Sequence, residues 1–320
     1  MNEEVPAAIL RLLDLLLKAR GRPVDLLRLR GEADTKDFEA AMRQLVAGGC
    51  HLERDPATVR LVRSGLGLWK QYLEHVLCDG PWRRIEIYPT TTSTQALIKA
   101  RPTEALLVLA DEQTAGHGRL GRRWVCPAGT GVLLSLTHQL DLNQPFTIDR
   151  LSFLAAVAVA EAIERIIGTT ELIQIRWPND LMVNGAKLAG ILVEIIQPVG
   201  TAVIGVGINV DLDHPHLIQL PPSLRDQVCS FRLCGWPADR LHVASEIILS
   251  IDQHLQAEDV EPAITQWRRR NLLNQEMVSL RSEGQTITGT VIDLDPDEGL
   301  IVRRQSGEIV HLHASTTSLL

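Results

Sequence analysis

Short helical patterns separated by turn residues fill the first part of the chain. The apolar spacing within residues 5–20 predicts an amphipathic helix. Residues 24–30 predict a second short helix, and Asp34 or Thr35 can cap a third one. Residues 51–63 then alternate on both sides of Pro56, as a hairpin does. Three helices followed by a hairpin predict a winged helix-turn-helix over residues 1–65.

The centre of the chain is richer in predicted strands. A linker helix is predicted over 66–82. Short apolar or alternating runs predict strands at 85–88, 105–110, 132–138, 172–175, 188–196 and 202–210. A helix over 151–167 is apolar on nearly every side, which predicts that it is buried. With further helices near 240–256 and 260–272, the pattern predicts an α+β domain with a mixed or antiparallel sheet.

The pattern changes once more near the C-terminus. Short alternating strands follow one another there, separated by turn residues at 295–297 and 306–307. This pattern predicts a small β-barrel. The predicted domains are the winged helix-turn-helix over 1–65, a linker helix over 66–84, a central domain over 85–273 and the C-terminal barrel over 274–320.

Composition mainly excludes alternatives. With 45% hydrophobic and 22% charged residues, the 320-residue chain has the composition of a soluble globular protein. Its net charge of −7 does not support a polyanion-binding surface over the whole molecule. The five cysteines form no CxxC pair, so a reducing cytoplasm fits and neither a disulfide framework nor a zinc site is predicted. We expect no membrane span, since that needs about 20 apolar residues in a row, and no signal peptide.

The loop over 113–124 concentrates glycine and positive charge. Its glycines match the pattern GxGxxG: Gly116, Gly118 and Gly121. A strand rather than a helix follows them, so a dinucleotide-binding fold is not predicted. Its arginines are Arg119, Arg122 and Arg123, and no Asp or Glu occurs over 113–140. Because glycine N–H groups and arginine forks suit phosphate oxygens, we expect anion binding; the alternative is a solvated surface loop.

A second polar group lies beside strongly apolar strands. The segment 177–180 reads Trp-Pro-Asn-Asp, and Lys187 follows at the start of the next strand. A compact ammonium suits a carboxylate or a developing oxyanion. Three alternatives remain open here: a surface lysine, a Trp177 in the core, and an ordinary hairpin turn at 184–185. In the strand over 202–210, Gly205 and Gly207 indicate a close approach of a ligand or another backbone, and Asn209 is a candidate polar contact.

Together these segments resemble the biotin–protein ligase family, in its bacterial bifunctional ligase and biotin-operon repressor form with an N-terminal winged helix. The matching stretches are 92–95, 113–124, 177–180, 187–194 and 205–210, in the family's order and spacing. The resemblance covers 85–320 well, and 1–65 only in domain outline. It implies a central domain like that of class II aminoacyl-tRNA synthetases and an SH3-like C-terminal domain.

The resemblance also implies a two-step reaction. Biotin and MgATP give biotinyl-5′-AMP, and biotin then passes to a lysine of the biotin carboxyl carrier protein of acetyl-CoA carboxylase. The implied catalytic residues are Arg119 for phosphate charge, Lys187 for the biotin carboxylate and Asp180 for the incoming lysine. The implied biotin contacts are Ser93, Thr94, Gln95, Gln113, His117, Gly118, Arg119, Lys187 and Gly207. The implied ATP and adenylate contacts are Gly116, Gly118, Arg119, Arg122, Arg123, Trp124, Asn179 and Asn209; no resident metal site is expected, because Mg²⁺ would bridge the phosphates.

Two positions depart from the family pattern. Gln95 stands where the family often has asparagine, and it keeps the same donors and acceptor. His117 replaces the first arginine of a Gly-Arg-Gly-Arg loop, which removes one permanent charge. We expect catalysis to survive both changes and adenylate retention to loosen.

The winged domain raises the question of a repressor role. Residues 1–65 hold 11 Lys/Arg and 10 Asp/Glu, so the domain is nearly neutral, although Arg54, Arg60 and Arg63 lie in the wing. The hypothesis is weak or lost operator-DNA binding. Two alternatives to the ligase stay open: a biotin-responsive DNA-binding repressor with weak ligase activity, and a lipoate or octanoyl transferase. The resemblance also leaves open a homodimer formed on adenylate binding.

Overall fold

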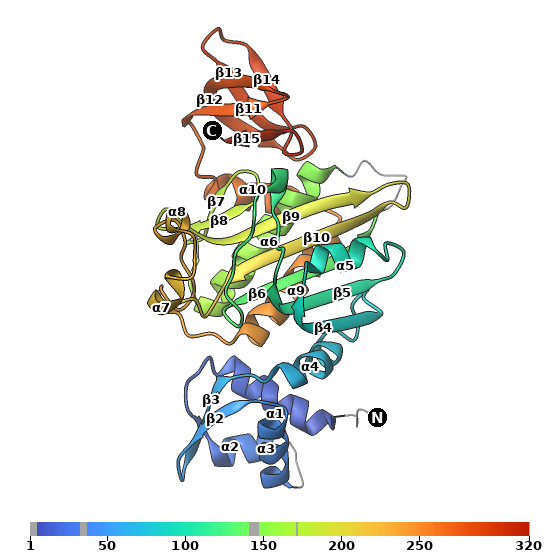
Figure 1. Cartoon of the computed structure of the whole chain (residues 1–320), viewed down its shortest axis with the longest axis vertical. Coiled ribbons are helices and arrows are strands. Elements are labelled where there is room, and N and C mark those ends of the chain that lie inside the picture. The colour runs from blue at the N-terminus through green and yellow to red at the C-terminus, as the bar shows by residue number, and fades with distance from the viewer. Residues whose placement is uncertain (1–4, 33–36, 141–146, 171, 320) are drawn as a thin grey trace.

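The computed structural model describes residues 5–32, 37–140, 147–170 and 172–319. Three units follow one another along the long axis, with the central one carrying the largest sheet (Figure 1). None of the helices in the described ranges is long and apolar enough to cross a bilayer. The predicted α+β architecture is confirmed.

The N-terminal unit consists of three helices and a small antiparallel sheet in the order β1-β3-β2. Its elements are α1 (Ala7–Lys18), β1 (Val24–Asp25), α2 (Leu26–Glu32), α3 (Phe38–Ala47), β2 (His51–Arg54) and β3 (Thr58–Arg63). The predicted apolar face of α1 is buried, and residues such as Leu12 and Leu13 are fully enclosed. This unit therefore has its own core and a β2–β3 hairpin in the place of a wing.

Two predictions in this unit need correction. The expected helix over 24–30 begins only at Leu26, because Val24 pairs with Val59 as strand β1. Asp25 then accepts hydrogen bonds from the N–H groups of Leu27 (2.8 Å) and Arg28 (3.0 Å), which caps the helix. The proposed caps Asp34 and Thr35 lie outside the described residues. The observed cap of α3 is Asp37, which accepts from the N–H of Ala40 at 2.8 Å.

The linker helix is shorter than predicted. A single 3-10 turn, η1 (Leu66–Leu68), precedes α4 (Trp69–Val76), and helical structure ends there rather than near Gly80. Trp69, Tyr72 and Leu73 are buried, so α4 packs between the first two units instead of spanning solvent.

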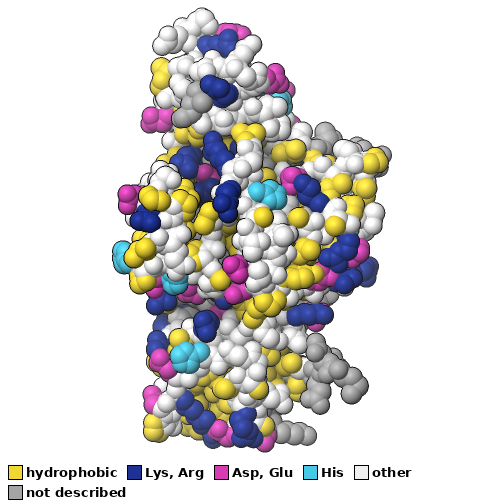
Figure 2. Space-filling model, viewed as in Figure 1, with side chains coloured by type: hydrophobic (Ala, Val, Ile, Leu, Met, Phe, Trp, Pro, Cys, Tyr) yellow, Lys and Arg dark blue, Asp and Glu magenta, His cyan; other side chains and the backbone are white. Residues whose placement is uncertain are grey.

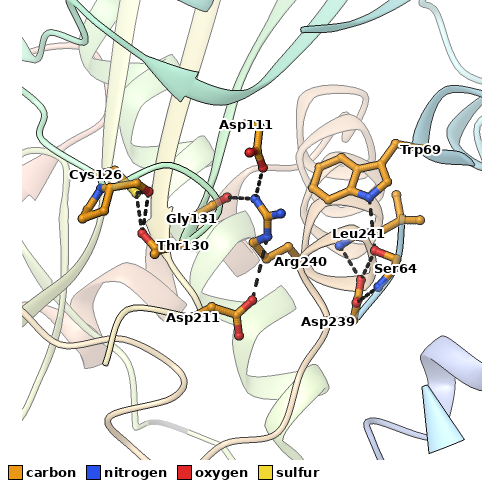
Figure 3. Close-up of polar contacts among 11 residues, drawn as sticks. Ser64, Trp69, Asp111, Cys126, Thr130, Gly131, Asp211, Asp239, Arg240 and Leu241 are labelled. Carbon is orange, nitrogen blue, oxygen red and sulfur yellow. Dashed lines mark hydrogen bonds and ion pairs between the residues drawn. The ribbon is translucent and has the colours of Figure 1, made fainter. Parts of the chain in front are cut away.

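A junction of buried and partly buried polar groups joins α4 to the central unit (Figure 3). Asp239 accepts hydrogen bonds from the N–H (2.6 Å) and the hydroxyl (2.7 Å) of Ser64. The neighbouring Arg240 lies 5.3 Å over the ring of Trp69 and donates to Asp111 at 2.6 Å. The two units are therefore held by directional bonds as well as by apolar packing.

The central unit is a seven-stranded mixed sheet in the order β4-β5-β6-β10-β9-β8-β7. Its strands are β4 (Arg84–Thr91), β5 (Leu106–Gln113), β6 (Gly131–Gln139), β7 (Gln174–Arg176), β8 (Asp180–Val183), β9 (Ala186–Ile196) and β10 (Thr201–Asn209). Among the described strands, β4 and β5 form the single parallel pair, and the other pairs are antiparallel. The strand β8 was not predicted by itself; the turn between β8 and β9 at Asn184-Gly185 has positive φ at both residues, as a two-residue hairpin requires.

Helices cover this sheet on both sides. In Figure 1, α6 (Ile148–Ile167) and α9 (Arg240–Leu255) lie behind the sheet, and the short α5 (Thr94–Lys99) lies in front of it. The remaining helices are η2 (Arg119–Gly121), α7 (His214–Leu217), α8 (Pro222–Arg225) and α10 (Glu261–Arg270). Helix α6 is buried along almost its whole length, as its all-round apolar sequence predicted, and it ends at the left-handed Gly168.

The C-terminal unit is a five-stranded antiparallel sheet in the order β14-β13-β12-β11-β15. Its strands are β11 (Met277–Ser282), β12 (Gln285–Asp295), β13 (Gly299–Arg304), β14 (Ile309–Leu312) and β15 (Thr317–Leu319). The carboxylate of Asp149, at the start of α6, accepts a hydrogen bond from the N–H of Ala314 at 2.7 Å. This bond holds the segment before β15 against the central unit.

Candidate active site

A cleft opens on the front of the central sheet, where the start of α5, the end of β5 and the middle of β10 meet. It contains about 460 Å³ of empty space, open solvent included. Its lining residues are Ser93, Thr94, Gln95, Gln113, His117, Gly118, Trp124, Leu134, Ser135, Asn179, Gly190, Ile191, Leu192, Gly205, Val206 and Gly207. The cleft therefore joins a polar end on α5 and β5 to an apolar floor on β9 and β10.

Buried hydrogen bonds order the polar end. Ser93 caps α5 by accepting from the N–H of Ala96 at 3.4 Å. The side-chain oxygen of Gln113 accepts from the N–H of Thr94 at 2.8 Å. The hydroxyl of Thr94 contacts that of Ser135 at 2.8 Å. The last residue of β5 and the first turn of α5 are thus locked together at the cleft.

Two glycines of β10 admit large side chains onto the floor of the cleft. A Cβ on Gly205 would lie 2.5 Å from the side-chain oxygen of Gln95. A Cβ on Gly207 would lie 2.5 Å from the indole of Trp124. The close approach at these glycines is therefore made by side chains of the same chain, where the sequence analysis expected a ligand or another backbone. The Nε1 of Trp124 is buried and has no hydrogen-bond partner among the described residues, so it is a donor available to a ligand.

Charged residues lie beside the floor of the cleft, near the start of β8. Lys187 forms an ion pair with Asp180, and its Nζ lies 5.5 Å from the centre of the Trp124 ring. Asp180 also accepts from Arg176 at 2.8 Å. Trp177 is buried, so the alternative that places it in the core is confirmed. The lysine is therefore held beside the cleft by a carboxylate and an aromatic face rather than projecting freely into solvent.

A second, more charged cavity adjoins the cleft below the C-terminal unit. It contains about 860 Å³, open solvent included. Its lining residues are Arg119, Leu120, Arg122, Arg176, Pro178, Asn179, Asp180, Gln227, Ser318 and Leu319. Figure 2 shows Lys and Arg side chains gathered on this face of the central unit. Asn179 lines both cavities, so they adjoin one another at this residue.

Arg119 is tied to the C-terminal unit. Its guanidinium donates to the backbone oxygens of Ala314 and Thr317, the latter at 2.8 Å. Burial lowers the pKa of Arg119 to about 10. Neither Arg122 nor Arg123 forms an ion pair within the described ranges. The loop thus keeps positive charge at the cavity that its own chain does not neutralise.

The structure brings most of the predicted site residues together. The cleft contains Ser93, Thr94, Gln95, Gln113, His117, Gly118, Trp124, Asn179 and Gly207. The charged cavity contains Arg119, Arg122, Asn179 and Asp180. Four predicted residues line neither cavity: Gly116, Arg123, Lys187 and Asn209.

Each of these four residues has an observed position. Lys187 lies at the margin of the cleft through its contact with Trp124. Gly116 accepts a hydrogen bond from the N–H of Trp124 at 3.0 Å, and Arg123 is exposed. The amide of Asn209 donates to the carbonyl of Cys229 at 3.0 Å. Asn209 therefore joins β10 to the segment beside Lys187 and does not face the cleft.

Sequence reasoning missed several lining residues. Ser135 is a polar residue within an apolar strand, and that signal was present in the sequence. Arg176 adjoins the segment 177–180 but was given no role. Ser318 and Leu319 belong to another unit, and no local pattern indicates that they reach the charged cavity.

Comparisons with known proteins agree with this geometry. A family model described as "Biotin/lipoate A/B protein ligase family" matches residues 86–212. "Bifunctional ligase/repressor BirA" of Bacillus subtilis (strain 168) is 31% identical over 237 residues, which are 72% of this chain and 71% of that protein. The chain belongs to the biotin–protein ligase family.

Two further comparisons support the assignment. "Biotin--[acetyl-CoA-carboxylase] ligase" of Mycobacterium tuberculosis is 30% identical over 249 residues, 72% of this chain and 90% of that protein. The solved structure of the biotin protein ligase from Aquifex aeolicus in complex with biotin and ATP superposes with a TM-score of 0.64 at 24% identity. It covers 75% of this chain and 99% of that chain, and it shows that the fold is shared.

Proposed function

We propose that this chain is a biotin–protein ligase that activates biotin with ATP and transfers it to a lysine of the biotin carboxyl carrier protein of acetyl-CoA carboxylase. The observation that carries the proposal is a pair of adjoining cavities that share Asn179: a cleft with a polar end and an arginine-lined cavity. Such a site suits a small ring compound with a carboxylate tail next to a nucleotide phosphate. The names of the ligases in Bacillus subtilis and Mycobacterium tuberculosis support the same activity.

In the first step, a carboxylate oxygen of biotin attacks the α-phosphorus of ATP, and pyrophosphate leaves. The two reactants are both anions, so the site must neutralise charge where they meet. Lys187 would hold the biotin carboxylate, for which it has to exchange Asp180. Arg119 would hold the phosphate, and its carbonyl partners on Ala314 and Thr317 would be replaced by oxygens that carry full charge.

Positioning accounts for the rest of the first step. Trp124 would cover the ligand from the Gly207 side and offer its unpaired Nε1 as a donor. Arg122 would add a second charge in the cavity. Bringing the two reactants into one geometry is itself worth a large part of the barrier, so a covalent enzyme nucleophile is not required.

In the second step, the ε-amine of the carrier lysine attacks the carbonyl carbon of the mixed anhydride, and AMP leaves. Asp180 lies in the charged cavity between Arg176 and Lys187. Once Lys187 has turned to the ligand, the Oδ1 atom of Asp180 becomes available as a hydrogen-bond acceptor. We propose that this oxygen orients the incoming amine.

A magnesium ion would enter with the nucleotide. No cluster of three or more His, Cys, Asp or Glu residues that could hold a metal occurs within the described ranges. Mg²⁺ keeps several waters and binds chiefly to substrate phosphates in such sites. The chain's own contribution would be the arginines that surround those phosphates.

The test is transfer of label to a purified carrier domain. The full chain is mixed with biotin, ATP, Mg²⁺ and the carrier domain, and biotinylated carrier is detected with streptavidin. We expect label that requires both biotin and ATP. No label in the complete mixture, or equal label with lipoate in place of biotin, would contradict the proposal.

A repressor role is the second candidate, because the chain carries a hairpin and three helices at its N-terminus and BirA of Bacillus subtilis is named a repressor. The charges argue for weak binding. Glu39 on α3 accepts two hydrogen bonds from Arg54 at 2.7 and 2.8 Å, and these hold the pKa of Glu39 down to about 2. Arg60 is paired with Glu53.

These pairs leave little charge for phosphates. We therefore propose that the ligase activity dominates and that operator binding is weak or lost. A gel-shift experiment on the promoter of the organism's own biotin genes, with biotin and ATP present, tests this. A specific complex at nanomolar protein would contradict it.

A further inference from the structure

The carboxylate of Asp149 is a buried charge to which the mechanism above gives no part. It lies in the first turn of α6, and its side chain is 6% exposed. One of its oxygens accepts the N–H of Ala314 at 2.7 Å, and the other lies 3.1 Å from Nδ1 of His313. Both partners belong to the segment 313–317, which leads from β14 into β15. Asp149 therefore fixes the C-terminal unit just before its chain reaches the charged cavity at Ser318.

The same segment holds Arg119 on its other side. Ala314 donates its N–H to the carboxylate of Asp149 and accepts from the guanidinium of Arg119 on its carbonyl oxygen. Both Ala314 and Thr317, the second carbonyl partner of Arg119, are buried. The two charges of opposite sign are therefore joined through the backbone of the C-terminal unit.

The electrostatics of Arg119 show the same relation. Burial lowers the pKa of Arg119, and the negative charge of Asp149 opposes that effect more strongly than the charge of Asp180 does. A buried guanidinium without a carboxylate partner is costly unless its environment offsets the desolvation. Asp149 therefore favours the charged Arg119 at this place both through the bonded segment and through space.

This contact leaves part of the guanidinium free. Both bonds to the C-terminal unit are made by Nη2, and within the described ranges Nε and Nη1 of Arg119 donate no hydrogen bond. Arg119 lines the charged cavity. An incoming phosphate can therefore bind Nε and Nη1 first, before Nη2 exchanges its two carbonyl partners. A guanidinium that is already placed loses less conformational entropy on binding than one that moves freely.

We propose that Asp149 is a positioning residue for the first step: by fixing the segment 313–317, it keeps Arg119 at the charged cavity before the nucleotide arrives. The inference rests on the proposed function, because that function assigns a nucleotide phosphate to Arg119. It gives the C-terminal unit a part in nucleotide binding, through two backbone carbonyls whose place is set from the start of α6.

The test is the biotin-dependent exchange of pyrophosphate into ATP, measured over a series of ATP concentrations with the full chain. Asp149→Ala removes the acceptor of the Ala314 N–H, and we expect the KM for ATP to rise about fivefold, because Arg119 must then be ordered by the nucleotide itself. The maximal exchange rate should stay within about twofold, since the bound phosphate holds Arg119 in the ground state and the transition state alike. An unchanged KM, or a fall in the maximal rate alone, would overturn the inference.

Three further variants separate positioning from general loosening of the two units. Asp149→Asn keeps an acceptor oxygen in the same place, so its KM should lie within about twofold of wild type. Asp149→Ser keeps a polar side chain at the start of α6 but is too short to reach Ala314, so it should match Asp149→Ala. Asp293→Ala breaks the pair with Arg268 (3.0 Å), a different bond between the same two units, and should leave the KM unchanged. A rise in Asp293→Ala or Asp149→Asn as large as in Asp149→Ala would overturn the inference.

A double-mutant cycle with Arg119 gives a readout that a structural role does not move. Arg119→Gln has no guanidinium for the C-terminal unit to hold, so adding Asp149→Ala to it should change the KM for ATP by less than about twofold. A further fivefold rise in the double variant would overturn the inference. Wild type without biotin-dependent exchange would overturn the proposed function, whereas active wild type with an additive cycle would overturn this inference alone.

Discussion

Two groups of arginines in this chain differ in whether the chain itself supplies carboxylate partners for them. Two of the three in the wing are paired within their own unit: Arg54 bonds to Glu39, and Arg60 to Glu53. Those of the 113–124 loop lie in a stretch without acidic residues. The comparison shows that counting charges does not identify a binding surface; what matters is whether the same chain supplies the partner carboxylates.

Arg119 is the informative intermediate case. It has partners, but they are the neutral carbonyls of Ala314 and Thr317, and burial lowers its pKa to about 10. A guanidinium in that state gains from an anion more than one already paired with a carboxylate does. At neutral pH it still carries its charge, as the proposed phosphate contact requires.

Removing Lys187 should give the largest effect and would sharpen the contrast. Lys187→Ala removes the cation beside Trp124, and we expect biotinyl-5′-AMP formation to fall about 100-fold or more, because no other lysine of the described residues lies beside the cleft. Single-turnover adenylate formation measures this. Lys70→Ala, which removes an exposed pair with Glu74 3.7 Å away, is the control and should be unchanged. A similar fall in both variants would contradict the assignment.

Releasing the wing arginines would test the other side of the comparison. Glu39→Gln frees both Arg30 and Arg54, so binding to random duplex DNA should tighten severalfold. The slope of log K against log salt should steepen by about 1 to 2. Fluorescence anisotropy over a salt series measures both quantities. If wild type already shows the steeper slope, the self-pairing account of the wing is wrong.

The ion pair between Arg101 and Glu86 in the central unit should contribute to stability and have little effect on catalysis. Arg101 donates to both oxygens of Glu86 (2.9 and 2.7 Å), and these bonds lower the pKa of Glu86 to about 2 from 4.5. We expect Glu86→Gln to lower the free energy of unfolding by about 1 kcal/mol at pH 7, a value reduced for solvent screening.

The pH dependence of that effect follows from the direction of the shift. A carboxylate whose pKa is lowered in the folded state stabilises the fold at pH values above its unfolded-state pKa. This contribution disappears as the pH falls from about 4.5 to about 2. The difference between wild type and Glu86→Gln in urea unfolding should therefore shrink over that range. The exposed pair of Glu308 with Arg304 supplies the control, and Glu308→Gln should cost less than about 0.5 kcal/mol. A difference that is constant with pH would refute the account.

Local sequence patterns predicted the helices and strands well where the element's own apolar residues determine its structure. The buried helix α6 and the strands β5, β6, β9 and β10 follow directly from apolar runs and their flanking turns. The pattern failed where a polar side chain overrides propensity. Asp25 stops one strand and caps the following helix, so the segment 24–30 is divided between two structures.

The sequence predicted most of the residues that line the candidate site but not the hydrogen bonds and ion pairs that hold them. The glycines and polar residues that line the cleft stand in short segments, and their chemistry is visible in those segments. The turning of Gln95 towards Glu194, the pairing of Lys187 with Asp180 and the bonds from Arg119 to the C-terminal unit depend on residues far away in the chain. Such contacts are set by tertiary packing, for which one sequence carries no local signal.

The most direct test of the contrast between the two groups is the biotin-dependent exchange of pyrophosphate into ATP, measured for wild type, Arg119→Gln and Arg54→Gln. In the proposed mechanism this half-reaction requires the charged cavity and needs neither the carrier protein nor DNA. The account predicts that Arg119→Gln loses about 30-fold or more in exchange rate, while Arg54→Gln stays within about twofold of wild type. Equal rates in the two variants, whether both normal or both lost, would contradict it.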